Sequence, residues 1–153
     1  MTHTIPRAPL ILGLAGLLPF LWGALTVILP DLGLLTAQTI GPRFAGPYVM
    51  LFYGAVILSF MSGVLWGFAT KAEGRLAATG YALSVIPALW AFFMTGGGPV
   101  SAGMSLIFGF AGLLAIDWQF ARWGLVPGWW MPLRLGLSAV VIACLAVGVL
   151  SYG

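Results

Sequence analysis

Five long apolar stretches run through this chain, and their interiors carry no charged residue. A helix that crosses a bilayer needs about 20 consecutive, mostly apolar residues. The stretches lie at about residues 9–29, 48–69, 76–95, 100–121 and 133–151. We therefore expect an all-α protein, an integral membrane bundle of five transmembrane helices that forms a single domain over residues 1–153.

The composition supports the same class of protein. Hydrophobic residues make up 61% of the chain and charged residues 6%, which leaves too little polar surface for a water-soluble globule. The first stretch is longer than the core of a secretory signal peptide, and no Ala-x-Ala site follows it, so we expect it to be retained. The lipid bilayer is the first predicted partner. The six Lys and Arg residues are too few to predict a nucleic-acid surface.

The basic residues predict an orientation, because Lys and Arg near the ends of spans are retained on the cytoplasmic side. With five crossings, Arg43 falls on one side of the membrane, and five residues fall on the other: Arg7, Lys71, Arg75, Arg122 and Arg134. We therefore expect the amino end in the cytoplasm and the carboxyl end in the periplasm.

Groups that carry chemistry are scarce. His3 is the only histidine, Cys144 is the only cysteine, and Glu73 falls in a predicted turn. No nucleophile–base pair and no cluster with metal-ligand spacing can be assembled from them. The sequence therefore predicts a protein that is not an enzyme, with no catalytic residue, no metal and no cofactor.

Charged and aromatic residues gather where the fourth stretch ends and the fifth begins. Asp117 lies about one turn before that end, and Arg122 and Arg134 flank a loop that contains Trp129 and Trp130. Tryptophan favours the membrane interface. We interpret these five residues as an interfacial anchor in which Asp117 pairs with a basic partner. The alternative is a proton or cation site at Asp117.

Small residues recur every four positions along the second stretch, at Ala55, Ser59, Gly63 and Gly67. Residues spaced by four share one face of a helix, and small side chains let another helix approach closely. We predict that this stripe packs inside the bundle. The alternative is that it contacts a partner protein or a second copy.

Two prolines interrupt apolar stretches beside tryptophans: Pro19 lies near Trp22, and Pro87 lies near Trp90. Proline removes a helical hydrogen bond and bends the helix. Such bends are well tolerated in membranes, and their simplest role is to help a small bundle pack. The alternative is an apolar pocket formed by these four residues, for a tetrapyrrole, a quinone, a sterol or a lipid tail.

Several segments together resemble a known family. They are Tyr53–Gly67, in which Ser-Phe-x-x-Gly-x-x-Trp-Gly is the most specific part, Gly80–Pro87, Asp117, Ala121–Trp130 and Leu133–Leu135. The sequence resembles an uncharacterised five-helix membrane family of proteobacteria that includes mitochondrial transmembrane protein sixty-nine. The resemblance implies a multi-pass protein of a bacterial inner membrane, and a polar residue before Trp66, where this chain has Leu65. A fainter likeness, in helix number and aromatic content only, is to the tryptophan-rich translocators that bind tetrapyrroles.

These observations predict a non-catalytic accessory or assembly subunit that packs against a larger respiratory or photosynthetic membrane complex. The reason is that the chain is nearly all membrane, with short loops and close-packing stripes. The alternative is a binder or carrier of a hydrophobic ligand such as a tetrapyrrole, a quinone or a lipid.

Overall fold

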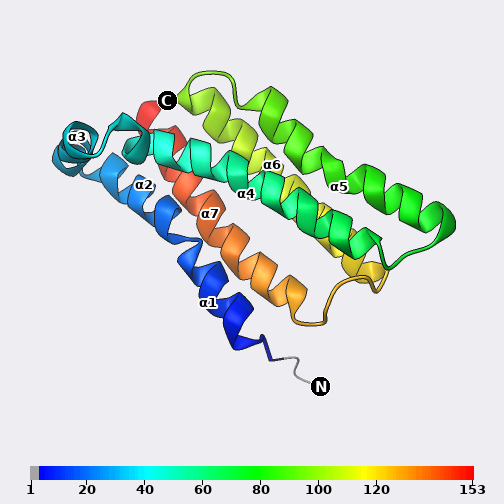
Figure 1. Ribbon diagram of the computed structural model, residues 1–153. Coiled ribbons are helices and arrows are strands. Elements are labelled where there is room, and N and C mark those ends of the chain that lie inside the picture. Colours follow the sequence, from blue (N-terminus) through cyan, green and yellow to red (C-terminus); the bar gives the residue numbers. More distant parts are fainter. Residues whose placement is uncertain (1–3) are drawn as a thin grey trace.

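The computed structural model describes residues 4–153, which form helices joined by short turns and loops (Figure 1). Its elements, in chain order, are α1 (Arg7–Ala15), α2 (Leu18–Ile28), α3 (Pro30–Thr39), the 3₁₀ turn η1 (Pro42–Phe44), α4 (Gly46–Ala69), α5 (Gly74–Met94), α6 (Pro99–Arg122) and α7 (Trp130–Tyr152).

Within the described chain, five helical segments are long and apolar enough to cross a membrane. The first combines α1 and α2, and the others are α4, α5, α6 and α7. The longest have 24 residues, or about 36 Å at 1.5 Å per residue, which exceeds the roughly 30 Å of a hydrocarbon core. The predicted all-α fold and its five spans are therefore confirmed, with boundaries that differ from the expected ones by three residues or fewer.

Pro19 and Pro87 affect their spans differently. The first span breaks between α1 and α2, at Gly16 and Leu17, and Pro19 lies in the first turn of α2, where its missing N–H leaves no bond unmade. Pro87, by contrast, does not interrupt α5, which runs continuously through it. The N–H of Ala88 instead donates to Ser62 Oγ on α4, at 2.8 Å. A hydroxyl of a neighbouring helix thus supplies an acceptor at the proline.

The helix α4 is the centre of the bundle, because it packs against α2, α5, α6 and α7. The core between them is filled by large apolar side chains: Phe20, Met50, Leu58, Leu65, Leu106, Phe110, Leu113, Phe120 and Leu145. Glycine allows the closest approaches. A Cβ on Gly109 of α6 would stand 2.8 Å from a methyl of Leu58 and 2.9 Å from the ring of Trp90. Leu65, where the resemblance implies a polar residue, is fully buried in this core.

The two ends of the bundle differ. Figure 1 shows the start of α1, the α4–α5 turn and the α6–α7 loop at one end, and α3, the α5–α6 turn and the C-terminus at the other. We call the first the basic end, because its exposed cations are Arg7, Lys71, Arg75 and Arg122. At the other end, Thr26 Oγ1 accepts a hydrogen bond from the Gly46 N–H at 2.8 Å and joins α2 to the start of α4.

Candidate functional site

Asp117 and Arg134 form an ion pair inside the bundle, near its basic end. The Nε of Arg134 on α7 donates to Oδ2 of Asp117 on α6 at 2.8 Å, and the two side chains are 7% and 0% exposed. Trp130 Nε1, one turn before Arg134, donates to Oδ1 of the same carboxylate at 2.9 Å. Each carboxylate oxygen therefore accepts one charge-assisted bond from α7, and the pair fixes the register of α6 against α7.

The sequence predicted that Asp117 pairs with a basic partner, and the structure confirms the pairing and identifies Arg134 as the partner. The pair is buried between α6 and α7, which pack against each other. Arg122 is exposed, and its guanidinium lies 5.0 Å from the ring of Trp118. Arg134 therefore neutralises a core carboxylate and does not belong with the exposed cations of the basic end.

The two tryptophans of the anchor also differ. Trp130 is buried, and its ring meets Phe68 of α4 edge to face at 5.0 Å. Trp129 is half-buried, and its ring lies 5.9 Å from that of Trp130. Trp130 is thus a core residue with a hydrogen-bonding role.

Two buried side-chain atoms of α7 have no hydrogen-bond partner among residues 4–153: Nη2 of Arg134 and Oγ of Ser138. Ser138 is 1% exposed and lies one turn after Arg134 on the same face of α7. Sequence reasoning missed Ser138. Its four-residue spacing from Arg134 is the signal that identifies it, since such pairs share a helix face.

The small-residue stripe does not pack inside the bundle, so that prediction is wrong. Ser59, Gly63 and Gly67 are exposed, Ala55 is half-buried, and no side chain of the described residues would come within 4 Å of a Cβ added to Gly63 or Gly67. The core-facing side of α4 instead carries large apolar side chains such as Leu58, which gain more from burial than small ones do. The stripe is left on the outer surface.

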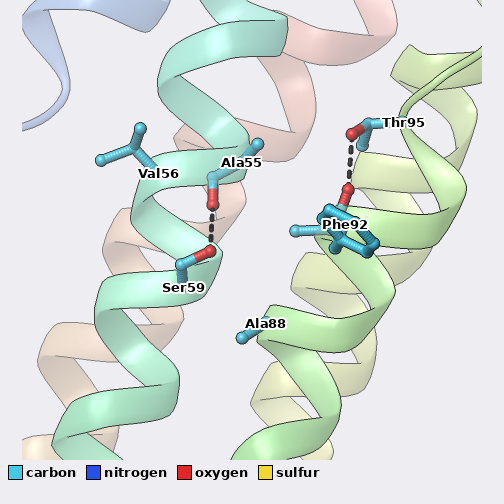
Figure 2. Close-up of a pocket in the computed structure, with 7 residues that line it drawn as sticks. Ala55, Val56, Ser59, Ala88, Phe92 and Thr95 are labelled. Atoms are coloured by element: carbon cyan, nitrogen blue, oxygen red, sulfur yellow. Dashed lines mark hydrogen bonds between the residues drawn. The ribbon is translucent and has the colours of Figure 1, made fainter.

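A groove lies between α4 and α5, and Ala55 and Ser59 of the stripe form part of its wall. It has a volume of about 420 Å³ and is lined by Ala55, Val56, Ser59, Ala88, Ala91, Phe92 and Thr95. Figure 2 shows Ser59 of α4 and Ala88 of α5 across the gap from each other. The hydroxyls of Ser59 and Thr95 donate to carbonyls of their own helices, those of Ala55 and Ala91. The groove therefore offers no unpaired hydroxyl donor to an occupant.

The structure does not bring the four residues of the predicted pocket together. Trp22 and Pro19 lie on α2, which packs against α4 and α7, whereas Pro87 and Trp90 lie on α5, which packs against α4 and α6. Trp22 Nε1 donates to the Phe44 carbonyl at 3.0 Å, and Trp90 Nε1 donates to the Ser105 carbonyl at 2.6 Å. Each tryptophan ring thus makes a hydrogen bond to a different part of the bundle. The prediction of a single pocket formed by these four residues is wrong.

Metal-binding groups do not gather anywhere in residues 4–153. That part of the chain holds no cluster of three or more His, Cys, Asp or Glu side chains that could bind an ion. His3 lies outside the described residues.

Comparison with known proteins identifies a family and a relative. Residues 5–150 match a family described as "Protein of unknown function (DUF3429)". Transmembrane protein 69 of Xenopus tropicalis is 30% identical over 141 residues, which are 90% of this chain and 51% of that protein. The chain thus spans about half the length of this relative. No solved structure matches it. The two matches confirm the family resemblance drawn from the segments between Tyr53 and Leu135.

Proposed function

The chain belongs to the DUF3429 family of unknown function, and from its structure we propose that it is a non-catalytic accessory subunit that docks a transmembrane helix of a larger membrane complex. The observation that carries this proposal is the outward position of the stripe. Gly63 and Gly67 would have no described neighbour within 4 Å of an added Cβ, although glycine inside a helix is unfavourable by about 1 kcal/mol relative to alanine.

The shape and chemistry of this surface favour a helix as the occupant. Ala55 to Gly67 covers 13 residues of α4, and the first and last of them lie about 18 Å apart along the helix axis. Helices in lipid associate mainly by close packing of small residues. Because the hydroxyls of Ser59 and Thr95 already donate to their own helices, the surface suits an apolar partner segment.

The test is site-specific photo-crosslinking in the native membrane. A photo-reactive residue at position 59 should form an adduct with one discrete membrane polypeptide, and Gly63→Leu should remove that adduct. Gly112→Leu is the matched control, because Gly112 of α6 is also exposed with nothing within 4 Å. If position 59 forms no adduct, the stripe docks no helix. The same conclusion follows if the adduct still forms in Gly63→Leu.

A second candidate function is the binding of a hydrophobic ligand in the groove between α4 and α5. The protein would then carry a quinone, a tetrapyrrole or a lipid. Its volume of about 420 Å³ falls in the usual range of ligand sites, roughly 300–1,000 Å³. Ubiquinone or a porphyrin should then quench tryptophan fluorescence saturably, and Ala88→Leu should weaken the quenching at least tenfold. If quenching rises linearly with ligand concentration, and to the same extent in the wild type and in Ala88→Leu, this function is excluded.

We also propose a location, the bacterial inner membrane with the basic end in the cytoplasm. Among the described residues, the exposed cations Arg7, Lys71, Arg75 and Arg122 lie at that end and Arg43 at the other, which follows the rule for cytoplasmic loops. A periplasm-specific reporter fused to the carboxyl end should be active. Activity of a cytoplasm-specific reporter at that position would reverse the orientation.

A further inference from the structure

The buried ion pair leaves hydrogen-bonding capacity that no described side chain or main-chain group uses. Nη2 of Arg134 and Oγ of Ser138 are both sealed from the surface and unpartnered, and the two residues are only 6% and 1% exposed. Buried polar groups in folded proteins are nearly always paired, either with protein atoms or with ordered water. The two residues lie one helical turn apart on α7, which brings a single shared partner into consideration.

Arg134 and Ser138 lie on the same face of α7, four residues apart. Side chains four residues apart on a helix have Cβ atoms about 5–6 Å apart, and both lean toward the helix N-terminus. The Ser138 hydroxyl therefore leans toward the turn that carries Arg134. A guanidinium nitrogen only donates, whereas a hydroxyl both donates and accepts. A molecule that fits must accept a bond from Arg134 and exchange one with Ser138.

We infer that a buried water molecule bridges Arg134 and Ser138 and forms part of the core of the bundle. Water is the class of ligand that matches the charge of the site. Asp117 already neutralises Arg134 at 2.8 Å, so a bound anion would leave a net negative charge in the interior, which is strongly unfavourable.

The carboxylate of Asp117 can complete the coordination of this water. Each of its oxygens accepts one hydrogen bond, from Trp130 or from Arg134, and each has a second lone pair. Buried waters typically make about three hydrogen bonds. The proposed site provides that number: the guanidinium, the hydroxyl and the carboxylate.

The sign of a stability change tests the inference. If Ser138 binds water, Ser138→Ala removes a hydrogen bond, and the ratio of folded to unfolded protein should fall about fivefold, the equivalent of about 1 kcal/mol. If its hydroxyl has no partner, the same variant removes an unsatisfied buried group and should leave the ratio unchanged or raise it. Ser151→Ala, at an exposed position of the same helix, controls for the preference of alanine for helices.

A second measurement keeps the test independent of folding yield. Solid-state NMR of the ¹⁵N-arginine protein in lipid bilayers, with magnetisation transferred from water, should show transfer to the Arg134 guanidinium, assigned by its loss in Arg134→Lys. Ser138→Val, which places a methyl group in the site, should reduce that transfer at least threefold. Absence of transfer in the wild type, or equal transfer in Ser138→Val, would overturn the inference, as would an unchanged or raised stability of Ser138→Ala.

Discussion

Removing one partner of the Asp117–Arg134 pair should destabilise the bundle more than removing both. Asp117→Asn keeps an acceptor for Trp130 but leaves the guanidinium of Arg134 without its counter-charge at 6% exposure. Breaking a buried ion pair from one side costs about 3–5 kcal/mol, whereas replacing both partners by neutral residues is often nearly neutral. The double variant Asp117→Asn with Arg134→Met should therefore recover most of the loss.

The position of the pair makes the two single variants unequal. Asp117 precedes the last residue of α6, Arg122, by five residues, or about 7.5 Å along the axis. A long arginine side chain can extend toward the headgroups from that depth, so Asp117→Asn should lose about 3 kcal/mol. The shorter carboxylate has no such escape, so Arg134→Met should lose about 4–5 kcal/mol. The double variant should lose about 1–2 kcal/mol, through the remaining missing hydrogen bond.

The assay is reversible unfolding by sodium dodecyl sulfate in mixed micelles of lipid and detergent, followed by far-ultraviolet circular dichroism. Arg122→Met is the control, because it removes an exposed charge from the same end of the bundle. The reasoning is refuted if Asp117→Asn loses no more stability than this control. It is equally refuted if the double variant loses the sum of the two single losses, because the pair would then not be coupled.

Two further predictions concern packing between spans. Ser62→Ala removes the acceptor of the Ala88 N–H and should lower the free energy of unfolding by about 1–2 kcal/mol. Ser59→Ala on the outer face should change it by less than about 0.5 kcal/mol. Equal effects of the two variants in the same micelle assay would contradict the role of Ser62. Gly109→Ala would place a Cβ 2.8 Å from a core side chain and should destabilise by about 1–3 kcal/mol. Gly112→Ala, with open space around it, should stabilise the folded protein by about 0.5–1 kcal/mol. If thermal unfolding ranks the two variants in the opposite order, Gly109 does not lie in close contact with Leu58 and Trp90.

Some site features follow from sequence spacing and others do not. The presence of Asp117 within reach of Arg134 is visible in the sequence, because the two residues flank one short connection between antiparallel helices. Whether Arg134 or Arg122 pairs with Asp117 is not visible in the sequence, because the answer depends on the direction of each side chain once α6 and α7 are packed. The same holds for Ser138, which becomes notable only when its hydroxyl is buried without a partner.

The amino-acid sequence by itself determined the number, length and approximate limits of the spans, since hydrocarbon admits helices with apolar surfaces and sets their length at about 20 residues. It did not determine which face of each span turns inward. In a soluble helix the polar side faces water, but these spans are apolar on all sides, so the pattern carries little directional information. Only tertiary packing decided that Leu58 points into the core while Gly63 points out, because large side chains gain more contact between helices than a stripe of small ones does.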